Sequence, residues 1–91
     1  MKGGGALNRI GFMVLSILRQ SEAVNKFSSM TVREIAEMES DFGLKENTVS
    51  KKAREFEKAG FVKRGLKEGR ADTFYITPEG LNLLEKERNE V

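Results

Sequence analysis

The chain has 91 residues and a net charge of +2, and this length is enough for one domain with one small hydrophobic core. It contains no cysteine and no histidine. Disulfides and thiolate metal sites are therefore excluded, and the commonest metal ligand and the usual general base are missing. The longest mainly apolar run, Ile10–Leu18, is too short to span a bilayer. We expect a soluble, cytoplasmic protein that is not an enzyme and that needs no metal, cofactor or membrane.

Basic charge is concentrated in residues 45–70. This segment carries nine Lys or Arg and four Glu, a net charge of +5, whereas the rest of the chain sums to −3. Basic charge gathered on one part of a small fold is the electrostatic signature of a polyanionic partner. A solvated surface can have the same composition, so the charge alone leaves both interpretations open.

The beginning of the chain predicts one helix and a loop. Residues 1–5 include three consecutive glycines, and we expect them to be disordered, with a single domain over residues 6–91. Apolar residues at helical spacing predict a helix over Ala6–Gln20. Its buried face consists of Leu7, Ile10, Val14, Ile17 and Leu18. The polar segment Ser21–Ser29 predicts a loop, and Met30 is expected to form a short first strand.

A second helix is predicted over Val32–Glu39. Thr31 and Glu34 have the spacing of a capping box, which marks the start of a helix. The side chains expected to be buried on this helix are Val32, Ile35 and Met38. The segment Asp41–Gly43 is expected to form the turn that follows.

The third helix is predicted over Glu46–Ala59, because Gly60 suits the left-handed conformation that often ends a helix. A β-hairpin follows. Its strands are expected over Phe61–Gly65 and Asp72–Thr77, which are rich in β-branched and aromatic residues, and its tip over Leu66–Ala71.

The last helix is expected to begin at Pro78, since a proline in the first helical position loses no hydrogen bond, and Thr77 can cap it. It runs to about Asn89. Together the elements predict an α+β, mainly α fold: three helices form the core, a two- or three-stranded β-wing follows, and a C-terminal helix completes the domain.

The third helix has two distinct faces. At 100° per residue, Val49, Ala53 and Phe56 fall together and should face the core. The opposite face carries one amide and three cations at helical spacing, with two hydroxyl residues beside them. These six candidate DNA-contact residues are Asn47, Thr48, Ser50, Lys51, Arg54 and Lys58. Asn can bond adenine, and Lys and Arg can bond guanine, in a major groove wide enough for a helix. A generic solvated helix face is the alternative.

The hairpin extends this basic surface. Its four cations are Lys63, Arg64, Lys67 and Arg70. Gly65 and Gly69 are expected to permit the tight reversal, so that the cations project from a narrow tip. Such a tip can follow the phosphate backbone or enter a minor groove, where Arg is favoured. An ordinary solvated hairpin remains the alternative.

Residues 7–84 resemble a winged helix-turn-helix domain of the MarR-like transcription regulators and their small single-domain relatives. The matching segments are TVREIAE at 31–37, LKENTVS at 44–50, FEKAGFVKR at 56–64 and YITPEG at 75–80. The resemblance implies that the third helix is the recognition helix and that Leu66–Ala71 is the wing. It also implies a sequence-specific regulator of double-stranded DNA, most simply a repressor that acts as a homodimer.

Two features depart from the MarR-like pattern. The turn through Glu39–Phe42 is about three residues longer than the commonest version, and the long terminal helices that serve dimerisation and ligand sensing are missing. Winged helices also serve as protein-docking modules in replication, transcription, plasmid or viral assemblies. Such a module is the second hypothesis, and a mobility-shift experiment with DNA separates it from the first.

Two apolar residues are candidates for a homodimer interface. Phe12 falls among polar residues on the first helix, and Leu83 falls opposite Leu81 and Leu84 on the last helix. Large apolar groups on polar faces favour a second interface. Scattered surface apolar residues are also common, and Leu15 and Met13 can widen the core face of the first helix.

Overall fold

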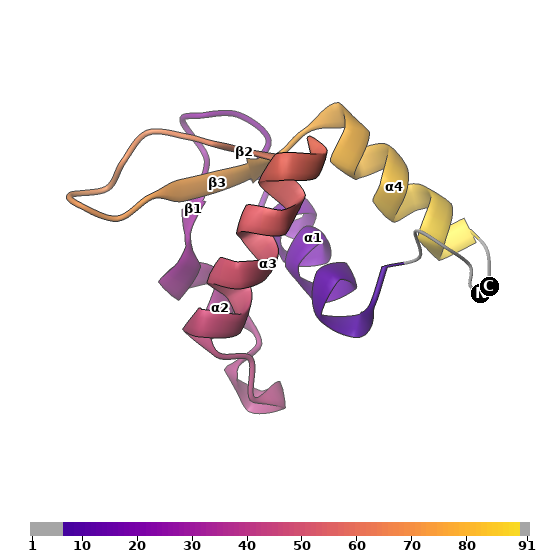
Figure 1. Cartoon of the computed structure of the whole chain (residues 1–91), viewed down its shortest axis with the longest axis horizontal. Coiled ribbons are helices and arrows are strands. Elements are labelled where there is room, and N and C mark those ends of the chain that lie inside the picture. Colours follow the sequence, from indigo (N-terminus) through magenta and orange to yellow (C-terminus); the bar gives the residue numbers. More distant parts are fainter. Residues whose placement is uncertain (1–6, 90–91) are drawn as a thin grey trace.

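A computed structural model describes residues 7–89 of the chain. Its elements follow the predicted order (Figure 1): helices α1 (Arg9–Gln20), α2 (Val32–Met38), α3 (Glu46–Ala59) and α4 (Pro78–Asn89), strands β1 (Met30–Thr31), β2 (Val62–Arg64) and β3 (Thr73–Ile76), and the 3₁₀ turn η1 (Ser40–Phe42). The α+β prediction is confirmed. The predicted disorder of Met1–Gly5 lies outside the described residues. None of the described helices is long and apolar enough to cross a membrane.

The three strands form one antiparallel sheet with β3 in the centre, in the order β1-β3-β2. Met30 lies opposite Phe74, and Val62 opposite Ile76. The expected first strand at Met30 is therefore confirmed, and the wing has a third strand at its base. The β2–β3 hairpin projects beyond the helices, with its tip at the far left of Figure 1.

Most helix ends follow the local signals in the sequence. The capping box is present: Thr31 Oγ1 accepts from the Glu34 N–H at 3.1 Å, and Glu34 Oε1 accepts from the Thr31 N–H at 2.9 Å. Gly60 ends α3 in the left-handed conformation with φ +87°. The predicted start of α1 at Ala6 is wrong, because Asn8 is the N-cap and its Oδ1 accepts from the Gly11 N–H at 2.7 Å.

The expectation for the end of α2 also needs correction. The helix ends at Met38, not at Glu39, and the Met38 side chain is exposed instead of buried. Met38 is the last residue of α2, so no further helical turn follows to cover its side chain. The predicted turn at Asp41–Gly43 is confirmed: Asp41 and Phe42 belong to the 3₁₀ turn η1, and Gly43 is its C-cap with φ +76°.

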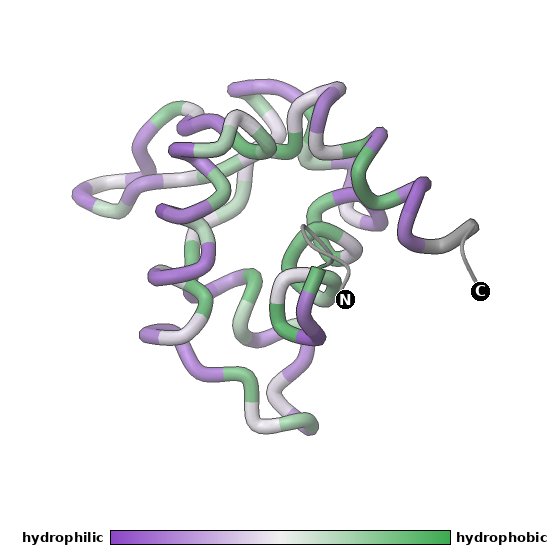
Figure 2. The backbone as a smooth tube through the Cα atoms, turned by 45° about the vertical axis from the view of Figure 1, so that its right-hand side comes forward, coloured by the Kyte–Doolittle hydropathy of each residue, from purple (hydrophilic) through white to green (hydrophobic). Residues whose placement is uncertain are grey.

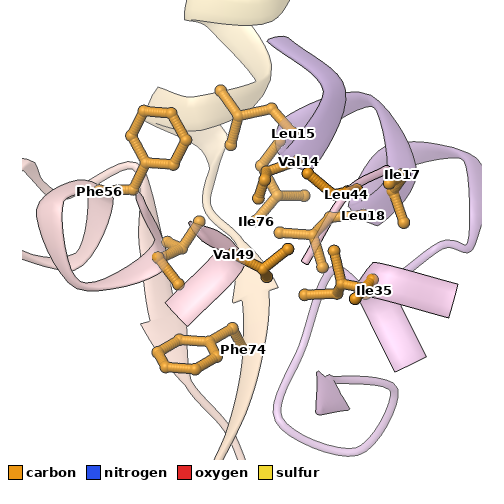
Figure 3. Packing of buried hydrophobic residues seen from close by; sticks show 14 of the residues in the cluster. Val14, Leu15, Ile17, Leu18, Ile35, Leu44, Val49, Phe56, Phe74 and Ile76 are labelled. Atoms are coloured by element: carbon orange, nitrogen blue, oxygen red, sulfur yellow. The ribbon is translucent and has the colours of Figure 1, made fainter. Parts of the chain in front are cut away.

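The hydrophobic core lies where the inner faces of α1, α2 and α3 meet the sheet. Its largest fully buried residues include Leu15, Leu18, Ile35, Val49 and Ile76. Figure 3 shows these side chains pointing toward one another from four different elements, with Phe56 and Phe74 at the edge. The core therefore fixes which face of α3 is turned outward.

Gly80 in the first turn of α4 supports a testable prediction. A Cβ at this position would meet the Phe61 carbonyl oxygen and approach Ile76 Cγ1 to 2.7 Å. Gly80→Ala should lower the free energy of unfolding by about 1–3 kcal/mol, because this overpacking against backbone outweighs the better helix propensity of Ala. Asn82→Ala, on the exposed side of the same helix, is the matched control and should change stability little. Urea unfolding measures both, and a stabilised Gly80→Ala variant would contradict the packing.

Candidate nucleic-acid interface

The two faces of α3 are arranged as predicted. Val49, Ala53 and Phe56 are buried. On the opposite face Asn47, Thr48, Lys51, Arg54 and Lys58 are exposed, and Ser50 is half-buried. Figure 2 shows the hydrophilic outer edge of this helix and the hydrophobic edge that faces α1. Asn47, Lys51, Arg54 and Lys58 therefore form one exposed stripe along α3, and Thr48 and Ser50 lie beside it.

Packing at the end of α3 holds this stripe in place. The Phe56 ring meets the Phe61 ring edge-to-face, with centroids 6.1 Å apart. Lys52 lies beside the stripe and is largely covered: its Nζ lies 2.9 Å from Glu55 Oε1 and 5.8 Å from the Phe56 ring centroid. The hydrogen bond and charge of Lys52, and then the charges of Lys51 and Lys58, lower the pKa of the Glu55 carboxyl. The Lys52 side chain thus packs against its neighbours on α3 and is not one of the exposed cations of the outer stripe.

The tip of the wing is closed by local hydrogen bonds. The backbones of Glu68 and Ala71 donate to each other at 3.0 Å, and Gly69 has φ +64°. Gly69 therefore permits the reversal, as predicted. Lys67 and Arg70 are both exposed around this tip.

Gly65 has a different role from the one expected. It is not among the described residues with positive φ. A Cβ there would instead collide with the Ser29 side chain and lie 2.9 Å from the Lys26 carbonyl oxygen. Its missing side chain lets the loop before β1 pack against the base of the wing, where the Leu66 N–H donates to the Lys26 carbonyl at 3.2 Å.

A buried threonine completes this attachment. The Ser29 hydroxyl donates to Thr73 Oγ1 at 2.7 Å, and the Thr73 hydroxyl donates to the Leu66 carbonyl at 2.6 Å. The loop, β3 and the outgoing arm of the wing are thereby tied together. The wing is therefore fastened at its base and exposed at its tip.

The predicted cations divide into two groups. Lys51, Arg54, Lys58, Lys63 and Arg70 make no ion pair within residues 7–89. Arg64, by contrast, pairs with Glu57 at 3.1 Å and with Asp72 at 2.9 Å. Lys67 lies 3.8 Å from Asp72 and is more exposed. The first group is available to an anionic partner, whereas Arg64 already has two.

The recognition helix and the wing face a common open groove of about 740 Å³. Its lining includes Ser50 and Arg54 from α3 and Arg64 from β2. Arg33 of α2 also lines it, is exposed, and lies 3.5 Å from Glu37. Arg33 was not among the residues predicted from the sequence, although a cation at the start of the helix before the recognition helix is a usable signal.

The candidate dimer residues occupy different surroundings. Phe12 is 36% exposed and lines an apolar hollow of about 360 Å³ with Met13 and Phe42. Phe42, 67% exposed, was assigned only to a turn in the sequence analysis. Leu83 is partly buried against the core and lines a second hollow of about 280 Å³.

The expectation that Leu83 lies off the core face is therefore wrong. Leu81 and Leu83 are both partly buried and Leu84 is fully buried, because α4 packs on α1 as well as on the sheet. Leu15 is fully buried and Met13 partly so, which confirms the wide core face of α1. The two hollows share Leu7 and Asn8, so Phe12 and Leu83 flank the beginning of α1. Within residues 7–89 there is no group of His, Cys, Asp or Glu suited to a metal ion.

Comparison with known proteins places this arrangement among winged helices. No family model matches the chain. The DNA-binding protein TubR of a Clostridium botulinum C phage is 29% identical over 79 residues, which cover 87% of this chain and 94% of TubR. The solution structure of the DNA-binding TubR fragment from Clostridium botulinum superimposes with a TM-score of 0.69 and 28% identity, over 89% of this chain and 96% of that one.

A MarR-family transcriptional regulator from Rhodococcus sp. RHA1 has the same fold. It superimposes with a TM-score of 0.72 and 22% identity over 91% of this chain, which spans 54% of the regulator. The chain is therefore a winged helix-turn-helix protein that is similar to TubR in sequence and to MarR regulators in fold.

Proposed function

We propose that this protein is a sequence-specific regulator of transcription that binds double-stranded DNA as a homodimer and acts in the cytoplasm. The observation that carries the proposal is the exposed stripe of Asn47, Lys51, Arg54 and Lys58 on α3, whose Arg54 lines one open groove with Glu68 and Ala71 of the wing. The similarity to TubR, which is named a DNA-binding protein, supports it. Occupancy of an operator would make the protein a repressor in the simplest case.

In this proposal α3 enters the major groove. Its amide and cations reach base edges there, since Asn suits adenine and Lys or Arg suits guanine. Thr48 and Ser50, beside the stripe, bond phosphates or bases near the start of the helix. The outer face of α3 can be polar without loss of stability, because α3 is held against the core by its buried face.

The wing supplies contacts that do not depend on sequence. Lys63, Lys67 and Arg70 are exposed along the hairpin, and their charges attract the phosphate backbone. Phosphate contacts fix the position and orientation of a protein on the duplex, while base contacts specify the site. The two parts of the surface therefore have separable roles.

The homodimer is proposed to form through α1 and α4 around Phe12 and Leu83. The apolar hollow that Phe12 shares with Phe42 provides exposed apolar surface on an otherwise polar side of the molecule. Burial of such surface favours association. Two linked subunits can bind two half-sites roughly one helical turn apart.

Selection of bound sequences from random duplex DNA tests the proposal as a whole. We expect a two-fold symmetric consensus to be enriched. Binding without any preferred sequence would remove the claim of specificity, and the absence of binding in mobility-shift experiments would favour the docking module instead.

DNA binding should depend strongly on salt. Each phosphate neutralised by a Lys or Arg adds about −0.9 to the slope of log affinity against log salt concentration. Because five of the predicted cations are free of ion pairs within the described chain, the slope should be steep. Fluorescence anisotropy with a labelled duplex at several salt concentrations measures it. A slope near zero would contradict the electrostatic part of the proposal.

Substitutions on α3 and on the wing should have different effects. Arg54→Ala or Asn47→Ala should cost about 1–3 kcal/mol on the preferred duplex and relax its sequence preference, because a base contact is lost. Lys67→Ala or Arg70→Ala should weaken binding to all duplexes alike and flatten the salt slope by about one unit.

Lys86→Ala on α4 is the matched control for charge, since Lys86 is exposed and outside the DNA surface of α3 and the wing. Sedimentation equilibrium checks that this variant remains a dimer, because α4 belongs to the proposed dimer interface. It should leave both affinity and slope nearly unchanged. If the α3 substitutions left the ratio of preferred to random affinity unchanged, α3 would not be the reading helix.

Charged substitutions at the Phe12 hollow should break the dimer. Phe12→Glu and Phe42→Glu place a carboxylate where apolar surface is proposed to be buried, and they should yield monomers that bind operator DNA more weakly. Phe27→Glu is the control, because Phe27 is 78% exposed and outside this hollow. Sedimentation equilibrium gives the mass in solution. Wild-type protein that sediments as a monomer at micromolar concentration would rule the dimer out.

A further inference from the structure

Arg64 differs from the other cations of the proposed interface in its contacts. Its Nε donates to both carboxylate oxygens of Glu57, at 3.1 and 3.2 Å, and its Nη1 donates to Asp72 Oδ2 at 2.9 Å. The guanidinium also lies over the Phe74 ring, 5.7 Å from its centroid. Glu57 belongs to α3, and Asp72 immediately precedes β3. One side chain thus joins the recognition helix to both arms of the wing.

This environment is unfavourable for a phosphate. Arg64 brings one positive charge, but its two carboxylate partners bring two negative charges within hydrogen-bond distance. A phosphate that approached Arg64 would be repelled by Glu57 and Asp72, whose carboxylates lie within hydrogen-bond distance of the guanidinium. Arg54 and Arg70, with no ion pair in the described chain, present no such obstacle.

The wing, in turn, needs a support on the side of α3. The loop before β1 fastens its base through Gly65, Leu66 and Thr73, and the β2–β3 ladder spans only the pairs from Val62–Ile76 to Arg64–Phe74. Arg64 is the last residue of β2, where the hairpin leaves the body of the protein. Its bridge to Glu57 is therefore placed to fix the angle between the hairpin and α3.

We propose that Arg64 is a positioning residue that sets the wing against the recognition helix, and that it does not itself contact DNA. The proposal rests on the proposed function and narrows it. The Glu57–Arg64–Asp72 bridge holds the phosphate-binding tip at a fixed distance from the base-reading stripe of α3. Specific binding requires both to engage one duplex at the same time, so loss of the bridge should reduce specificity more than general affinity.

Neutralising the carboxylates gives a test in which the two roles predict different changes in the ratio of preferred to random affinity. If Arg64 were a phosphate contact, Glu57→Gln or Asp72→Asn would free it, and all duplexes would bind more tightly by the same factor, so that the ratio would stay unchanged. If Arg64 is a positioning residue, the same variants should lower the ratio of preferred to random affinity by about three- to tenfold, a range typical of coupled residues. Competition binding with the selected and a scrambled duplex measures the ratio.

The salt slope separates the roles a second time. Arg64→Gln should weaken the preferred complex but leave the slope unchanged, because no phosphate contact is lost. Arg64→Lys, which keeps the charge but not the planar two-sided geometry, should reduce specificity in the same direction. Arg70→Gln is the matched control: it removes the same charge from the wing and should flatten the slope by about 0.9.

Amide hydrogen exchange of the free protein tests the bridge without DNA. Arg64→Gln and Glu57→Gln should speed exchange of the Gly65 amide, which donates to the Thr73 carbonyl at 3.0 Å, by about two- to fivefold, as expected for a partly exposed ion pair. Arg70→Gln should not. Unchanged exchange, an unchanged ratio of preferred to random affinity for Glu57→Gln, or a flatter slope for Arg64→Gln would each overturn the positioning role. Wild-type protein that binds no duplex would instead refute the proposed function, while the exchange result would still decide whether the bridge exists.

Discussion

The burial of one face of α3 is the constraint on which the rest of the structure depends. Val49 and Ala53 are almost completely buried, and Phe56 closes the edge of the core against Phe61. Because a helix turns 100° per residue, this burial leaves no freedom in the direction of the opposite stripe. The surface that we propose for DNA is therefore set by the hydrophobic core and not by the polar residues that form it. Polar substitutions on the stripe can change recognition while the fold persists.

The wing is held by a different kind of interaction. Its strands are short, and its hydrophobic contact with the core is limited to residues near the base, such as Val62 and Phe74. Hydrogen bonds at Thr73 and ion pairs at Arg64 supply the remaining connections to the body. Surface ion pairs each contribute little to stability, but they are directional. They are thus suited to fixing the orientation of an element whose fold is already secured by the core beneath it.

The ends of the helices could be predicted from the sequence where the signal comes from neighbouring residues. The capping box at Thr31, the helix end at Gly60 and the start at Pro78 depend on neighbouring residues, and all three are confirmed. The periodicity of α3 also predicted which side chains face the core. The errors arise where contacts join distant segments. The fit of Gly65 against Ser29 and the partial burial of Leu83 depend on tertiary packing, which the periodicity of a single element does not contain.

The ion pairs of Arg64 show why a count of Lys and Arg along a sequence overestimates the number of cations that are free to bind an anionic partner. The segment 45–70 has a net charge of +5, in which Glu57 is already counted. Glu57 and Asp72, which lies just outside the segment, both pair with Arg64, so this cation is not free for a partner. The free cations that remain lie on the outer stripe of α3 and along the wing. In the proposed arrangement the charge of Arg64 adds little to the general attraction for DNA. Its ion pairs instead keep the wing in a fixed position relative to the stripe of α3. Attraction to phosphates strengthens binding to every sequence alike. A protein that must distinguish one site among many therefore gains more from a fixed wing than from one further phosphate contact.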